Sequence, residues 1–193
     1  MFYGFAKVVL TVFYSILFPV RTKGLENIPK SGGAVLCANH ISNHDPLALA
    51  VFAPRVVRYM AKKELFDMPF ISALVNWLHA FPVDRKANDT AAIKTAIKAL
   101  KNGDIIGIFA QGTRVLSGEA KAAKSGAALI AIKSGAPIIP VSISGRYRLF
   151  GRVNIVYGEP IYFEELAGQR LTSDLLERAI SVVMNKVEEL RGS

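Results

Sequence analysis

The sequence is poor in the residues that form disulfides and bind metals, because its 193 residues include one cysteine and three histidines. A single cysteine, Cys37, allows no disulfide within the chain, which fits a reducing compartment. Its apolar neighbours predict a small buried strand residue rather than a nucleophile. One cysteine and three histidines also give no metal-ligand spacing. We therefore expect neither a disulfide-stabilised fold nor a metal or other cofactor.

Acidic residues are also scarce: 15 Asp and Glu stand against 24 Lys and Arg, and the formal net charge is +9 at pH 7. The chain is nevertheless oily, with 51% hydrophobic residues and a mean hydropathy of +0.31. This mixture is too polar for a protein with several membrane spans. It favours an anionic membrane surface or a phosphorylated substrate as partner. Nucleic acid is the rival, but zinc-finger spacing and an aromatic RNA-binding signature are missing, so we expect no nucleic acid partner.

The first acidic residue of the chain is Glu26, and an oily segment precedes it. A helix over residues 2–18 would be roughly 26 Å long, shorter than a hydrocarbon core of about 30 Å. Lys7, Arg21 and Lys23 flank it, and no small-x-small pattern marks a signal-peptide cleavage site. We predict a membrane-associated helix at residues 1–20 that dips into the cytoplasmic leaflet. The alternative is a helix that packs on the protein's own core.

Residues 21–193 alternate short apolar segments with helical ones and contain no linker or internal repeat. The segments at 34–38, 56–60, 104–110 and 137–143 are rich in β-branched residues and predict strands. Helical spacing of apolar residues predicts one helix that ends before Gly103 and a last helix from about Ser173. Continuously apolar strands that alternate with helices indicate a single α/β domain with a mostly buried, largely parallel sheet flanked by helices.

The segment most informative about chemistry is residues 39–46, Asn-His-Ile-Ser-Asn-His-Asp-Pro. Asp45 and Pro46 are typical of a helix start, with Asp as N-cap and Pro at the first helical position. His40 then lies just after the end of a strand, so the side chains of His40 and Asp45 can meet across the strand-to-helix turn. A histidine held by a carboxylate can take a proton from a hydroxyl. Taken alone, the pattern fits equally well a helix cap beside a turn residue, and His44 is predicted to be a turn residue.

Three further segments make a resemblance specific. The chain resembles the glycerolipid acyltransferase family, and within it the 1-acylglycerol-3-phosphate (lysophosphatidate) acyltransferases. Four ordered blocks mark that family, and all four have counterparts here. The first is Asn39-His40 through Asp45, which contains the HX4D motif, and the second is Phe81-Pro82-Val83-Asp84-Arg85. The third is Phe109-Ala110-Gln111-Gly112-Thr113-Arg114, and the fourth is Ile138-Ile139-Pro140-Val141-Ser142-Ile143. Residues 61–66 also resemble the family's segment between the first two blocks, and the similarity extends over roughly residues 24–160.

The resemblance implies a role for each matching residue. His40 is implied as the general base and Asp45 as the carboxylate that orients it. The residues implied to hold the acceptor's phosphate are Arg85, Gly112, Thr113 and Arg114, a task that suits a guanidinium group and backbone N–H groups. Lys62 is implied to assist as a point charge, although a solvated surface lysine is an equal alternative. Pro140 and its strand are implied to line the acyl-donor side.

The third block departs from the family's usual Phe-Pro-Glu-Gly-Thr-Arg, because Ala110 and Gln111 replace Pro and Glu. Gln111 can still bind a hydroxyl, but it carries no charge, so the departure bears on which acceptor is used. The resemblance implies direct acyl transfer from acyl-CoA or acyl carrier protein to membrane-bound lysophosphatidate, giving phosphatidate at the cytoplasmic face of the cell membrane. Glycerol-3-phosphate or another lysophospholipid is an alternative acceptor. A non-catalytic lipid-binding relative is a second hypothesis, which the intact His40–Asp45 motif disfavours.

Overall fold

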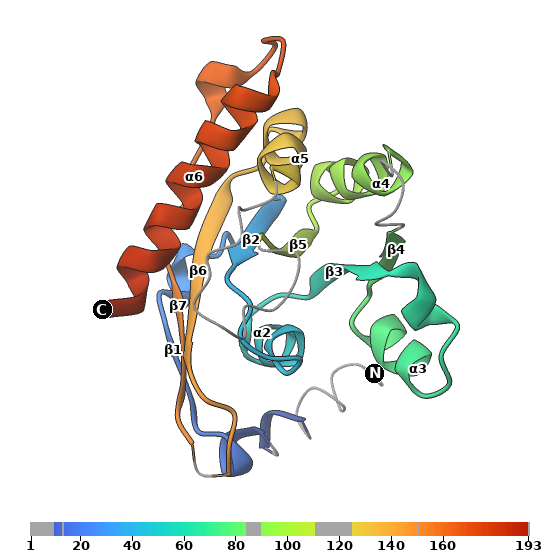
Figure 1. The fold of residues 1–193 in the computed structure, drawn as a ribbon, viewed down its shortest axis with the longest axis vertical. Coiled ribbons are helices and arrows are strands. Elements are labelled where there is room, and N and C mark those ends of the chain that lie inside the picture. Colours follow the sequence, from blue (N-terminus) through green and yellow to red (C-terminus); the bar gives the residue numbers. More distant parts are fainter. Residues whose placement is uncertain (1–9, 13, 84–89, 111–124, 150, 193) are drawn as a thin grey trace.

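The structure is a computed structural model of the chain, and it describes residues 10–12, 14–83, 90–110, 125–149 and 151–192 (Figure 1). Residues 10–12 and 14–17 are helical. The strands are β1 (Val20–Lys23), β2 (Ala34–Ala38), β3 (Val57–Lys62), β4 (Phe81–Val83), β5 (Ile105–Phe109), β6 (Ile138–Gly145) and β7 (Val153–Tyr157). The α-helices are α2 (Asp45–Phe52), α3 (Ile71–Trp77), α4 (Thr90–Lys101), α5 (Gly126–Ser134) and α6 (Ser173–Glu189). Short 3-10 helices cover Leu25–Asn27, Lys63–Phe66, Glu164–Leu166 and Leu190–Gly192.

The strands form one sheet in the order β1-β7-β6-β2-β5-β3-β4. Strands β6, β2, β5, β3 and β4 are parallel to one another, whereas β7 is antiparallel to β6 and β1 is parallel to β7. The prediction of a single α/β domain with a largely parallel sheet is therefore confirmed. The parallel strands bring their carboxyl ends to one edge of the sheet, which is where open α/β sheets bind ligands.

Helices cover both faces of the sheet, with α4, α5 and α6 on one side and α2 on the other (Figure 1). Alternate strand residues divide between the two layers of the core. Leu36 and Ile139 pack with α2, while Val35 and Ile138 pack with α4, α5 and α6. Since every residue of β2 is buried, the strand is continuously apolar in sequence.

The helical residues 10–12 and 14–17 have two different sides. Tyr14 is buried, with 2% of its surface exposed, and it packs against the layer that contains α2. Val12 and Ile16 are exposed at 53% and 62%. One side of this helix thus packs on the protein's own core, as the alternative hypothesis expected. The apolar side chains on its other side are exposed to solvent. Among the described residues, no helix is both long and apolar enough to cross a membrane.

Candidate active site

His40 and Asp45 meet at the carboxyl end of β2, across the turn that leads into α2. His40 Nδ1 lies 2.8 Å from Asp45 Oδ2. The aspartate is fully buried, while 15% of the histidine side chain is exposed. An ionised carboxylate only accepts hydrogen bonds, so Nδ1 carries the proton and Nε2 is the nitrogen able to accept one. The pairing predicted from the spacing is therefore present in the structure.

The carboxylate of Asp45 is held by the turn itself. Oδ2 accepts hydrogen bonds from the backbone N–H groups of Ile41 at 2.7 Å and Ser42 at 2.8 Å, in addition to His40. The expectation of Asp45 as an N-cap was wrong in detail: α2 begins at Asp45, His44 occupies the N-cap position, and no side chain caps the helix. The reason is that the carboxylate turns back onto the preceding loop, where three donors converge. The aspartate therefore fixes both the loop and the histidine ring.

Two contacts that the sequence analysis missed hold His40 in place. The Asn39 side chain donates to the carbonyl oxygen of Ile143 at 2.8 Å and accepts from the N–H of Ile143 at 2.7 Å, so β2 is tied to β6 one residue before the histidine. On its other side, the His40 ring stacks on Phe109 with centroids 4.3 Å apart. Asn39 and Phe109 both lie inside the matching blocks, and that position was the only available signal of their importance.

The described parts of the second and third blocks reach the same edge of the sheet. Ala38 is in register with Phe109, so β5 ends beside β2. Strands β3 and β4 follow β5 in the sheet order, and Lys62 at the end of β3 is in register with Val83 at the end of β4. Lys62 is half exposed and forms an ion pair of 3.3 Å with Glu64. The remaining implied substrate-binding residues of the second and third blocks lie outside the described residues: Arg85, Gln111, Gly112, Thr113 and Arg114.

Pro140 is not brought together with the histidine. It is in register with Cys37 on β2, and its ring lies against Gly158 and Leu190, next to the end of α6. His40 instead stacks on Phe109, which packs with the layer that contains α2. The two residues therefore lie on opposite faces of the sheet, and a role for Pro140 in donor binding stays a prediction.

Cys37 is fully buried, as its apolar neighbours predicted. Burial raises the pKa of its thiol to about 12, which keeps it protonated and unreactive near neutral pH. Within the described part of the chain, no three histidine, cysteine, aspartate or glutamate side chains gather as metal ligands would.

An aromatic cluster joins the N-terminal segment to the turn that holds His40 and Asp45, and its members are Tyr14, Phe18, His44 and Tyr147. Tyr14 Oη lies 2.8 Å from His44 Nδ1. The His44 ring stacks on Tyr147 with centroids 5.2 Å apart. The rings of Phe18 and Tyr147 form an edge-to-face contact with centroids 5.8 Å apart. His44 is thus a turn residue, as predicted, and it also connects two distant parts of the chain.

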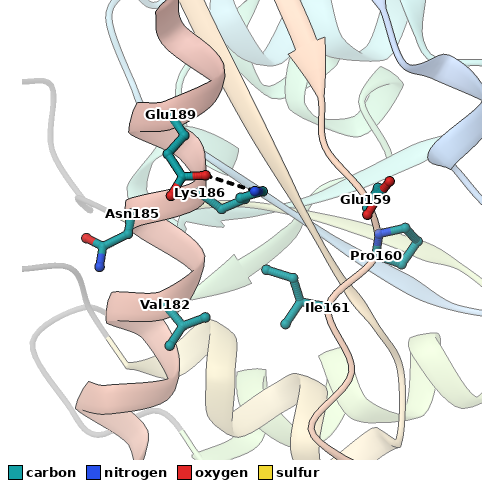
Figure 2. A pocket seen from close by; sticks show the side chains of 7 residues that line it. All are labelled: Glu159, Pro160, Ile161, Val182, Asn185, Lys186 and Glu189. Carbon is teal, nitrogen blue, oxygen red and sulfur yellow. Dashed lines mark hydrogen bonds and ion pairs between the residues drawn. The ribbon is translucent and has the colours of Figure 1, made fainter.

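A cavity of about 430 Å³ lies elsewhere, between α6 and the segment that follows β7 (Figure 2). Val182 and Ile161 face each other across it, and the ion pair of Lys186 with Glu189, 2.8 Å long, stands at one side. None of its lining residues belongs to the four blocks, so it is separate from the site around His40.

Comparison with known proteins settles the family. The family model described as "Acyltransferase" matches residues 19–144. The chain belongs to the acyltransferase family. This acyltransferase is 36% identical, over 97% of its length and all of the relative's, to the 1-acyl-sn-glycerol-3-phosphate acyltransferase of Bacillus subtilis. It is 35% identical to the protein of that name from Borreliella burgdorferi, over 69% of this chain and 54% of the relative.

A solved structure agrees with the fold. The crystal structure of the 1-acyl-sn-glycerophosphate acyltransferase PlsC from Thermotoga maritima superposes with a TM-score of 0.71 and 28% identity, covering 97% of this acyltransferase and 80% of that chain. The matched family region contains β1 to β5 and all but the last residue of β6, and therefore the His40–Asp45 pair. The buried carboxylate, the oriented imidazole and the sheet edge beside them are what a base needs to activate a hydroxyl.

Proposed function

We propose that this acyltransferase moves a fatty acyl group from acyl-CoA or acyl carrier protein to the free hydroxyl of 1-acylglycerol-3-phosphate, giving phosphatidate. The observation that carries the mechanism is the 2.8 Å contact between His40 Nδ1 and the buried Asp45 Oδ2. The acceptor is proposed from the activity for which the relatives are named, and the Bacillus subtilis relative aligns with 97% of this chain.

The reaction is a direct transfer with His40 as base. The acceptor hydroxyl gives its proton to His40 Nε2 as its oxygen attacks the thioester carbonyl carbon. The carbon–sulfur bond then breaks, and the thiolate takes the proton from the imidazolium. Asp45 fixes the tautomer and stabilises the imidazolium while it exists. The steps need no covalent acyl-enzyme.

The acceptor's phosphate is proposed to bind beside this base. Arg85 and Arg114 follow the described ends of β4 and β5, which lie at the edge from which His40 projects. A guanidinium group suits a phosphate because its donors match two phosphate oxygens at once. Lys62, at the end of β3, is a further positive charge at this edge.

The site is proposed to work at the cytoplasmic face of the cell membrane, with the N-terminal helix lying in one leaflet. The exposed Val12 and Ile16 form the outer side of that helix. Beside it lies the β6–β7 turn (Figure 1), whose described residues include the exposed Arg146, Arg148, Leu149 and Arg152. Apolar side chains next to arginines suit the interface of an anionic membrane, where each cation contributes roughly 1 kcal/mol.

The test of this function is a transfer assay with two donors and two acceptors. Labelled acyl-CoA and acyl carrier protein are each paired with lysophosphatidate and with glycerol-3-phosphate, and the products are separated. Labelled phosphatidate with either donor supports the proposal. If the only labelled product is lysophosphatidate made from glycerol-3-phosphate, the acceptor is glycerol-3-phosphate and the proposed acceptor is wrong. If no transfer occurs in any combination, the protein is better described as a non-catalytic lipid-binding protein.

A further inference from the structure

Asp45 holds three donors on one of its two carboxylate oxygens. His40, Ile41 and Ser42 all donate to Oδ2, while the buried Oδ1 completes no hydrogen bond. A buried carboxylate oxygen without a donor is costly. A further hydrogen-bond donor near Oδ1 would therefore stabilise this site.

Tyr147 packs beside the turn that carries this carboxylate: its ring stacks on that of His44, the residue before Asp45, with centroids 5.2 Å apart. Its hydroxyl is buried and also completes no hydrogen bond of ordinary geometry. Burial raises the pKa of Tyr147 well above its usual value, and Asp45, through its negative charge and as a hydrogen-bond acceptor, raises it further. A phenol that stays protonated beside a carboxylate is a donor.

The backbone around Tyr147 is tightly constrained. β6 ends at Gly145, whose φ is +96°, and a side chain there would collide with the backbone of Arg152. The turn is closed by a hydrogen bond from Arg146 N to Arg152 O at 3.2 Å and by one from Arg148 N to Arg146 O at 3.0 Å. The turn therefore gives the Tyr147 ring little freedom to move away from Asp45.

The ring of Tyr147 is also held from the other side. His44 stacks on it, Phe18 meets its edge, and Tyr14 fixes His44 through the 2.8 Å contact with Nδ1. Tyr14 and Phe18 come from the N-terminal segment, so the helix proposed to contact the membrane also contacts the tyrosine next to the catalytic carboxylate.

We infer that Tyr147 is a positioning residue for the catalytic pair: its hydroxyl donates to Asp45 Oδ1, and Tyr14 and His44 hold its ring in place. The donor completes the carboxylate's hydrogen bonds and so fixes the imidazole of His40 through Asp45. The N-terminal helix is then part of the active-site architecture as well as a membrane contact. This inference rests on the proposed role of His40 as base.

The hydrogen bond also tunes the base. A donor on Oδ1 disperses the negative charge of Asp45, and without it the carboxylate stabilises the imidazolium of His40 more strongly. The titratable groups that face Asp45 are His40, Tyr14 and Tyr147, with His44 and Tyr157 beside Tyr147. Since the base must be neutral, loss of the donor moves the acidic limb of the kcat profile to higher pH.

The experiment replaces Tyr147 by Phe, which removes only the hydroxyl. The matched control is Tyr157→Phe, because Tyr157 is 1% exposed and its hydroxyl is buried without a partner, but burial alone raises its pKa. We expect Tyr147→Phe to lower kcat roughly 10-fold, the size of a lost hydrogen bond to a charged group. The KM values for both substrates stay unchanged, the acidic limb moves to higher pH, and the control behaves like the wild type.

An unchanged kcat for a folded Tyr147→Phe would overturn the inference, as would equal losses in Tyr147→Phe and Tyr157→Phe. Should Tyr147→Phe not fold, Tyr14→Phe makes the same test, since it removes the bond that holds His44 against Tyr147; it should lower kcat without changing either KM, and wild-type kinetics would overturn the inference. His40→Ala in the same assay tests the base separately: an inactive His40→Ala with a fully active Tyr147→Phe refutes the positioning role alone, whereas an active His40→Ala refutes the base.

Discussion

The side chain of Asn39 and the backbone of Ile143 form a reciprocal pair of hydrogen bonds, 2.8 and 2.7 Å long, between two neighbouring parallel strands. Asn39 is 5% exposed, so water cannot readily replace it as a partner. The pair closes the sheet where the ladder of β2 ends, one residue before His40, the proposed base. Strand pairing and the position of His40 are thus linked at this point.

Asn39→Ala should therefore lower both stability and activity. Each unsatisfied buried group costs about 1–3 kcal/mol, so we expect the free energy of unfolding to fall by at least about 2 kcal/mol. We expect kcat to fall as well, because the strand end no longer fixes His40. Urea unfolding and the transfer assay measure the two effects. Asn102→Ala, at an exposed position after α4, is the control, and equal stability of the two variants would contradict the prediction.

Arg114 should matter for the acceptor more than for the donor. Loss of a charge-assisted hydrogen bond costs about 1.5–3 kcal/mol, so Arg114→Ala should raise the KM for lysophosphatidate about 10- to 100-fold. The KM for the acyl donor should change little, and Arg85→Ala should behave in the same way. Steady-state kinetics with each substrate varied in turn makes the measurement. Equal changes in both KM values would indicate a general structural role instead.

The exposed side of the N-terminal helix should be needed for membrane binding but not for the transfer reaction itself. Val12→Glu with Ile16→Glu changes two exposed side chains and leaves the buried Tyr14 in place. We expect weaker co-sedimentation with anionic vesicles and lower activity on vesicle-embedded acceptor, because the charges cannot enter the apolar layer. Activity on a short-chain, water-soluble acceptor should be retained. Val182→Glu, at a 54% exposed position on α6, is the matched control.

Sedimentation at low and high salt separates the two contributions, since only the attraction of the arginines to anionic lipid is screened. Undiminished sedimentation and vesicle activity in the double variant would show that this side of the helix does not contact lipid.

Strands β2, β3, β5 and β6 were predictable from sequence because they are short, apolar and bounded by turn residues, whereas β1, β4 and β7 were not predicted. Residues 34–38 form β2 with the predicted bounds, and the last helix begins at Ser173 as expected. The orientation of these strands was harder to read. A strand buried on both faces has no polar alternation, so the sequence did not reveal that Pro140 faces away from His40.

The contact between His40 and Asp45 was predictable because both residues lie within one turn, five residues apart. The aromatic cluster was not, because Tyr14, His44 and Tyr147 are far apart in the chain and each is unremarkable locally. The oily N-terminal segment is apolar on nearly all sides, so its pattern did not indicate that Tyr14 is the residue that packs inward. Contacts of this kind depend on the tertiary fold and leave no local signal.

The central claim is that His40, oriented by Asp45, is the base for acyl transfer. The most direct measurement is single-turnover transfer from labelled acyl-CoA to lysophosphatidate by the wild type, His40→Ala and Asp45→Asn, with folding checked by circular dichroism. General-base catalysis contributes about 10²- to 10⁴-fold, so His40→Ala should be slower by at least about 10²-fold, and Asp45→Asn should lose most of its activity while it remains folded. Near-normal transfer by a folded His40→Ala would contradict the account.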